Sequence, residues 1–257
     1  MKGKSVQISK SNLLAITNWL DVLAITAWGM LLLKYWLTDK LIYLIHPNYF
    51  ILSNLTAFIL LLAAGVKAWQ ILQKRSATSS NVQHISTLSP RLGSGILLLT
   101  ALLGFLIVPR PLTGEYTTPK EIADFTALSR IKIQAFRSST LPEERNLIDW
   151  VRMLNAYPEP DKFAGQKAKV QGFVIHLNTL PDDILVLARF VITHCALDAA
   201  PAGLPIKLPQ SRQTYPTNTW LEIEGQMITL ELEGKRELAI QAKFIKPIPE
   251  PKNPYEY

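Results

Sequence analysis

The chain has 257 residues, of which 48% are apolar, and a formal net charge of +7. The apolar content is too high for a disordered chain, and the single cysteine, Cys195, excludes an intrachain disulfide. Residues 113–257 hold 17 of the 27 basic and 18 of the 20 acidic side chains, which leaves 10 and 2 for residues 1–112. The positive charge therefore flanks apolar runs, which indicates membrane topology rather than a nucleic-acid partner.

Two long apolar runs predict membrane-spanning helices. The first covers residues 19–37, with an extension to Ile45 left open, and Asp21 and Lys34 lie near its ends. No small-residue cleavage pattern follows it, so we interpret it as a retained anchor rather than a secretory signal. A turn at residues 46–49 leads into the second run, residues 50–72, which is long enough to cross a hydrocarbon core of about 30 Å.

The third apolar run, residues 95–108, is short and reaches spanning length only with Leu92 and residues 109–112. It either crosses the membrane or forms a re-entrant or interfacial segment. Lys and Arg precede the first run and lie between the second and third, which predicts that both of these segments are cytoplasmic. We therefore expect a multi-pass protein of the cell membrane, two to three helices in residues 1–112. Three crossings place the C-terminal domain outside the cytoplasm, and two leave it inside.

A linker, residues 113–140, is followed by a soluble domain, residues 141–257, that begins with a helix. Thr140 is the expected N-cap, with Glu143 completing a capping box. An apolar stripe at helical spacing follows, made by Leu147, Ile148, Val151 and Leu154, and residues 157–160 end the helix.

Five antiparallel strands are then predicted from a period of two, at residues 168–177, 184–195, 205–208, 220–229 and 237–248, with a turn at residues 233–235. Glycines inside the strands, Gly172 and Gly225, permit sharp coiling. The expected fold class is thus a membrane α-helical region plus a mostly β domain, a five-stranded OB-like barrel preceded by a helix.

The segment of residues 189–199 concentrates side chains of metal-binding type, because His194, Cys195 and Asp198 lie within five residues. These are ligand types for zinc or copper. The alternative is that Cys195 is a buried small side chain, His194 is exposed and Asp198 caps a turn. His176 is a further candidate ligand or a surface histidine. Arg189, inside an apolar strand, needs a carboxylate partner or must project outward.

No catalytic signature is present: the sequence contains no GxSxG, P-loop, GxGxxG, HExxH or CxxC motif. Cys195 beside His194 is not a nucleophile–base pair on spacing alone, because such partners normally meet across a fold. We therefore expect that the protein is not an enzyme.

Four segments resemble the YcgQ-type family, whose members are described as permease accessory subunits with N-terminal membrane helices and a C-terminal domain of unknown function. These segments are residues 46–49, Gly165 with residues 172–174, residues 189–199 and residues 220–225. In the third, the family pattern is Arg-Phe-x-Ile-x-Cys-Cys-x-x-Asp-Ala, and this chain has His194 at the first cysteine. That departure disfavours dithiol chemistry and leaves metal binding open.

The resemblance implies a multi-spanning permease as partner, similar to organoarsenical exporters, and some relatives are associated with zinc. The first hypothesis is an accessory subunit that tethers its β domain near a transporter in the lipid bilayer, binding a metal ion or small solute there. The second is a membrane-anchored metal-binding module that acts without a permease. A third, an OB-type oligomer binder, is disfavoured for nucleic acid by the near-neutral domain.

Overall fold

The computed structural model describes residues 10–73, 90–114 and 141–257. The chain divides into two compact units, Met1–Arg110 and Pro111–Tyr257. This division falls two residues before the expected boundary at residue 112. Most of the predicted linker, residues 113–140, lies outside the described residues.

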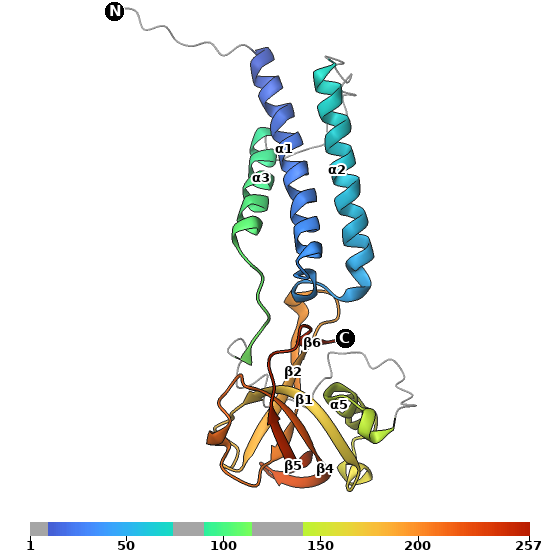
Figure 1. Cartoon of the computed structure of the whole chain (residues 1–257), viewed down its shortest axis with the longest axis vertical. Helices are drawn as coiled ribbons and strands as arrows, with labels where there is room; N and C mark the ends of the chain where they lie inside the picture. The colour runs from blue at the N-terminus through green and yellow to red at the C-terminus, as the bar shows by residue number, and fades with distance from the viewer. Residues whose placement is uncertain (1–9, 74–89, 115–140) are drawn as a thin grey trace, which may run out of the picture. The chain divides into compact units, whose positions relative to one another are not determined.

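The first unit contains three apolar helices, α1 (Lys10–Leu37), α2 (Phe50–Leu72) and α3 (Pro90–Leu106), and Figure 1 shows α1 between the other two. The bounds of α2 are those predicted. The extension of the first helix to Ile45 is wrong, because Asp39 adopts a left-handed φ of 55° and breaks the helix.

Two 3-10 turns, η1 (Leu41–Tyr43) and η2 (Pro47–Tyr49), complete the connection between α1 and α2. The predicted turn is confirmed: His46 is extended, and its Nδ1 accepts a hydrogen bond from the Asn48 N–H at 3.1 Å.

The segments Ile16–Leu37 and Pro47–Leu72 are long and apolar enough to cross a membrane, by length and composition. The third apolar helix, Leu92–Leu106, is shorter. At 1.5 Å per residue the 17 residues of α3 extend about 25 Å, less than a hydrocarbon core of about 30 Å.

Side chains of α1 hold α3 through its backbone. Trp28 Nε1 donates to the carbonyl of Leu97 at 2.9 Å. One turn from the end of α1, Tyr35 Oη donates to the Gly104 carbonyl at 2.6 Å and Lys34 Nζ donates to the Phe105 carbonyl at 2.9 Å. The last carbonyls of a helix have no intrahelical donor, so these bonds satisfy the C-terminal end of α3 and fix it alongside α1.

The second unit is built on a mixed six-stranded sheet rather than five antiparallel strands. The strands are β1 (Lys167–Ile175), β2 (Ile184–Val191), β3 (Ala200–Lys207), β4 (Trp220–Leu232), β5 (Lys235–Pro247) and β6 (Tyr255–Glu256). Their order is β1-β4-β5-β3-β2-β6, with a further pairing between β1 and β2. The β3–β5 and β2–β6 pairs are parallel.

The β4–β5 hairpin confirms the predicted turn. Leu232 pairs with Lys235, and both intervening residues have positive φ, 51° at Glu233 and 74° at Gly234. Positive φ at both positions is the requirement of a two-residue hairpin loop that matches the strand twist. Earlier in β4, the register shifts beside Gly225, where an added Cβ would overlap the carbonyl oxygen of Gln241.

The predicted helix starts later than expected. Residues Pro142–Glu144 form a 3-10 turn (η5), Arg145 is extended, and α5 (Leu147–Ala156) begins after Asn146. Asn146 accepts from the Asp149 N–H at 2.7 Å, and the Asp149 carboxylate accepts from the Asn146 N–H at 3.3 Å, which forms a capping box. The expected N-cap, Thr140, lies outside the described residues.

The core of the domain lies between α5 and the sheet. The apolar face of α5 is fully or almost fully buried, and its members are Leu147, Ile148, Trp150, Val151 and Leu154. After α5 ends as predicted, η6 (Pro160–Phe163) places the buried Phe163 edge-on against Trp150, with ring centroids 6.2 Å apart.

Candidate functional site

The loop after β2 carries the three predicted metal ligands. Strand β2 ends at Val191 rather than at Cys195, and a short 3-10 turn, η7 (Ala196–Asp198), follows. His194 and Cys195 therefore lie in a loop, where adjacent side chains need not point to opposite faces of a strand.

Asp198 closes this loop onto itself. Its Oδ2 accepts from the His194 N–H at 2.8 Å, from Thr193 Oγ1 at 2.8 Å and from the Cys195 N–H at 3.4 Å. Its Oδ1 accepts from the Thr193 N–H at 3.1 Å. Asp198 thus caps a turn. Partial burial opposes ionisation, but these hydrogen bonds outweigh it and hold the pKa of Asp198 below its usual value.

The structure brings His194 and Asp198 together, with His194 Nδ1 2.9 Å from Asp198 Oδ2. The His194 side chain is 71% exposed, and Cys195 is half-buried rather than buried. Across the ranges 10–73, 90–114 and 141–257, no three His, Cys, Asp or Glu side chains are grouped to hold a metal ion.

His176 does not join this loop. It follows β1, whose last residue, Ile175, pairs with Val186 near the start of β2, whereas His194 follows the end of β2. An extended strand rises about 3.3 Å per residue, so the two histidines lie at opposite ends of β2, more than about 20 Å apart. A shared metal ion is therefore excluded.

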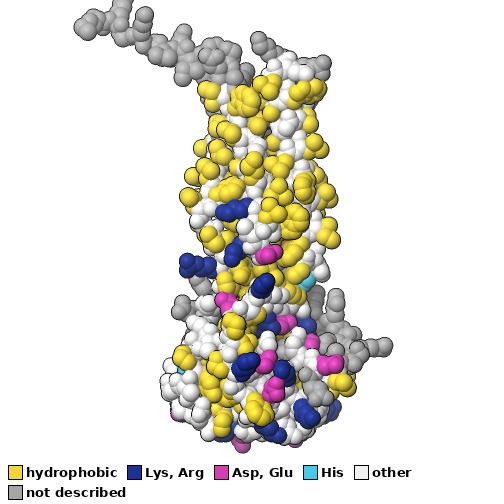
Figure 2. Space-filling model, viewed as in Figure 1, with side chains coloured by type: hydrophobic (Ala, Val, Ile, Leu, Met, Phe, Trp, Pro, Cys, Tyr) yellow, Lys and Arg dark blue, Asp and Glu magenta, His cyan; other side chains and the backbone are white. Residues whose placement is uncertain are grey.

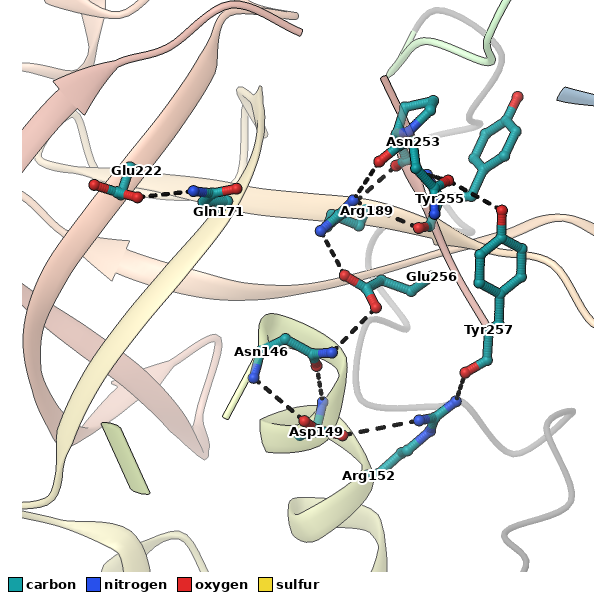
Figure 3. Close-up of polar contacts among 11 residues, drawn as sticks. Asn146, Asp149, Arg152, Gln171, Arg189, Glu222, Asn253, Tyr255, Glu256 and Tyr257 are labelled. Carbon is teal, nitrogen blue, oxygen red and sulfur yellow. Dashed lines mark hydrogen bonds and ion pairs between the residues drawn. The ribbon is translucent and has the colours of Figure 1, made fainter. Parts of the chain in front are cut away.

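Arg189 is the centre of a buried polar network, shown in Figure 3. Its Nη1 lies 2.5 Å from Glu256 Oε1, which is the carboxylate partner that an arginine in an apolar strand needs. Its Nη2 donates to the Asn253 carbonyl at 2.8 Å, and its guanidinium lies 5.6 Å from the centroid of the Trp220 ring. The side chains of the ion pair are 12% and 15% exposed.

The network fastens residues 253–257 to both β2 and α5. Strand β6 pairs with β2 through Phe190↔Tyr255 and Val191↔Glu256. On the other side, Asn146 Nδ2 donates to Glu256 Oε2 at 3.1 Å, and Arg152 Nη2 donates to the backbone oxygen of Tyr257 at 2.6 Å (Figure 3). One short segment thus links the sheet to the helix that covers it.

Burial dominates the titration of these groups. It lowers the pKa of Arg189 and raises the pKa of Glu256, while the ion pair between them opposes both shifts. Burial also raises the pKa of Tyr257 to about 12. Its hydroxyl donates a hydrogen bond to Asn253 Oδ1 at 3.0 Å.

A second polar cluster joins the three helices of the first unit. Lys67 of α2 forms an ion pair with Asp21 of α1, and Ser94 of α3 donates its hydroxyl to the same carboxylate. From the sequence, Asp21 was expected near the end of an apolar run, and no role was predicted for Lys67. The available signal was an acidic and a basic residue inside two otherwise apolar runs.

The described elements define a class of protein: two helices suited to a membrane, a third apolar helix, and a C-terminal mixed β domain. Residues 132–257 match the family model described as the DUF1980 C-terminal domain. That family has no established function, so the match supports the expected C-terminal domain and leaves the permease association as a proposal. No curated protein matches the chain.

Proposed function

We propose that the chain is a membrane-anchored accessory subunit of a multi-spanning permease. The observation that carries the membrane anchor is the exposure of apolar side chains on α2, where Ile51 is 81% and Leu62 70% exposed. A core helix of a water-soluble domain would bury such side chains, whereas hydrocarbon accommodates them. On the face shown in Figure 2, hydrophobic side chains cover the helices and charged side chains gather on the C-terminal domain.

Three crossings are the proposed topology, with the C-terminal domain outside the cytoplasm. The Lys and Arg distribution supports a cytoplasmic N-terminus and a cytoplasmic segment between α2 and α3. The bonds from Trp28, Lys34 and Tyr35 to the α3 backbone support a helix that runs along α1 rather than lying flat on the membrane. A bilayer accommodates its short length by local thinning.

Labelling of a single cysteine tests this topology. Leu197 is 98% exposed, so Leu197→Cys in a Cys195→Ser background presents one accessible thiol on the domain. A membrane-impermeant maleimide should label this variant in intact cells as fully as in permeabilised cells. Labelling only after permeabilisation would place the domain in the cytoplasm and overturn the three-crossing topology.

We infer an OB-like barrel for the domain. Strand β1 pairs with both β2 and β4, so the order β1-β2-β3-β5-β4 returns to β1 and supports a closed five-stranded arrangement. The permease partner is supported by the helices themselves, because Lys67 and Asp21 neutralise each other in an ion pair between the helices, which leaves a poor solute pathway.

Co-purification tests the permease association. The tagged full chain, solubilised from its native membranes in mild detergent, should recover a multi-spanning permease that mass spectrometry of the eluate identifies. A variant truncated after Arg110 keeps the helices and reports whether they suffice for the association. Recovery of the full chain as a solitary monomer would contradict the proposal.

A second candidate function, a metal-binding module without a permease, is favoured by the contact between His194 and Asp198. A carboxylate beside an imidazole nitrogen commonly orients a metal-binding histidine. Zinc titration of the full chain in detergent should show binding that is weakened at least tenfold by Cys195→Ala or His194→Ala. Equal affinity in all three proteins would discard these ligands.

A further inference from the structure

The third apolar helix, α3, is poorly suited to enter a membrane by itself. Its 17 residues extend about 25 Å and include three glycines, Ser94 and Thr100. Among the described residues, the segments that are long and apolar enough to span a membrane are those of α1 and α2. A helix that is short and interrupted by small or polar residues gains little from burial in hydrocarbon. If α3 crosses the membrane, another part of the chain must favour its insertion.

Helix α1 carries a stripe of polar side chains that faces α3. Asp21, Trp28 and Tyr35 are spaced by seven residues, which is about two helical turns, so they lie on one face of α1. At 1.5 Å per residue the stripe extends about 21 Å, nearly the length of α3. Each of the three side chains forms a hydrogen bond with α3. The partners, in the same order, are the Ser94 hydroxyl, the Leu97 carbonyl at 2.9 Å and the Gly104 carbonyl at 2.6 Å.

Gly104 allows α3 to approach this stripe closely. A Cβ added there would lie 2.6 Å from Leu31 Cδ2 and 3.5 Å from Tyr35 Oη. Leu31 is buried, with 3% of its surface exposed, so it has little room to move aside. The glycine therefore brings the α3 backbone within hydrogen-bonding distance of the Tyr35 hydroxyl, as small residues do where membrane helices pack.

The pair of helices α1 and α2 is ready to receive α3. Both precede α3 in the chain, and each is long and apolar enough to cross without it. Lys67 of α2 donates to Asp21 Oδ2, which leaves Oδ1 as the acceptor for the Ser94 hydroxyl. Trp28 lies near the middle of its span, where no water can accept from the indole N–H. Docking of α3 thus supplies an acceptor that Trp28 lacks in hydrocarbon.

We propose that α1 is the template for the insertion of α3, so that the contact between these two helices decides on which side of the membrane the C-terminal domain lies. When α3 docks on the stripe it crosses as the third span. Without docking it does not cross, and the domain stays in the cytoplasm. The inference rests on the proposed three-crossing topology and explains how a helix too short to insert by itself completes it.

Gly104→Leu separates templated from independent insertion. The substitution makes α3 more apolar, which favours independent insertion, but the new side chain overlaps Leu31 and blocks docking on α1. Gly95→Leu is the matched control, because it adds the same side chain to the same helix where an added Cβ meets nothing within 4 Å. Both are made in the full chain that carries Leu197→Cys and Cys195→Ser. The measurement is labelling by a membrane-impermeant maleimide in intact cells, relative to permeabilised cells.

The expected result is that Gly104→Leu lowers labelling in intact cells at least about fivefold, while Gly95→Leu labels as fully as the parent reporter chain. Equal labelling of Gly104→Leu and the parent would overturn the template, because α3 would then cross without docking. An equal loss in both variants would also overturn it, as a general effect of the added side chain. Labelling of the parent itself only after permeabilisation would instead overturn the three-crossing topology.

A second variant removes hydrogen bonds without adding bulk. Trp28→Phe with Tyr35→Phe deletes two donors from α1, keeps aromatic rings there and leaves the sequence of α3 unchanged. Independent insertion of α3 would not respond to these changes, whereas the template predicts clearly lower labelling in intact cells than in the parent. Labelling equal to that of the parent would contradict the role of the polar stripe.

Discussion

Replacing Arg189 by Met should release the segment of residues 253–257 from the domain. The substitution keeps the apolar stem, removes the guanidinium, and leaves the carboxylate of Glu256 buried without its cation. Breaking a buried ion pair in this way costs about 3–5 kcal/mol, and the pair is 12% and 15% exposed, so solvent screening reduces this little. About 1.4 kcal/mol changes an equilibrium constant tenfold. The equilibrium constant for local opening of this segment should therefore rise at least roughly a hundredfold.

Hydrogen exchange of the full chain in detergent, followed by mass spectrometry, measures this opening. Peptides that cover β6 and the end of β2 should exchange faster in Arg189→Met, while peptides from the β4–β5 hairpin should not change. Arg236→Met is the matched control, because Arg236 forms exposed ion pairs with Glu159 and Asp161 and should leave β6 protected. Unchanged exchange at β6 in Arg189→Met would refute the view that this arginine holds the segment.

Three further outcomes are expected. Asn146→Ala removes the cap of α5 and its bond to Glu256, and should lower the free energy of unfolding by about 0.5–2 kcal/mol in chemical denaturation. Gly225→Ala should cost about 1–3 kcal/mol in the same assay, since the new Cβ overlaps the β5 backbone. The pKa of Asp198 is lowered in the folded state, so its contribution is present at neutral pH and is lost as the pH falls through about 4 and below. Amide exchange at residues 193–195 should then accelerate relative to the rest of the domain, as it should at neutral pH in Asp198→Ala.

Local sequence patterns correctly predicted the elements whose bounds are set by their own residues and immediate neighbours. The second apolar run has the bounds of α2, because its ends are marked by the turn at Pro47 and by the polar residues after Leu72. The turn of Glu233 and Gly234 followed from a glycine between two alternating segments. Of the two alternatives predicted for Arg189, a carboxylate partner or an outward-projecting side chain, the first is confirmed, and the partner is Glu256.

These local patterns could not predict which strands pair when the strands are far apart in the sequence. Strand β6 has two residues, too few for any periodicity, and it exists because β2 and Arg189 hold it. Strand β3 begins at Ala200 instead of Pro205, since Gly203 and two prolines obscure its alternation. The parallel β3–β5 pair joins strands that are far apart in the sequence, so adjacency along the chain could not predict it.

At the loop that contains Asp198, residue types alone could not distinguish a metal site from a capped turn, and the geometry was needed. His, Cys and Asp at close spacing were compatible with both a metal site and a capped turn. The structure gives the turn, because the Asp198 carboxylate accepts from three successive backbone N–H groups, those of Thr193, His194 and Cys195. It also brings His194 against Asp198, so metal binding stays a prediction that the zinc titration decides.

Fractionation of cell membranes is the most direct test of the anchor on which the other proposals depend. Because the segments Ile16–Leu37 and Pro47–Leu72 can each cross a bilayer, the full chain should remain in the membrane pellet after washing with alkaline carbonate and leave it only with detergent. A chain that stays in the supernatant after ultracentrifugation without detergent would contradict the account.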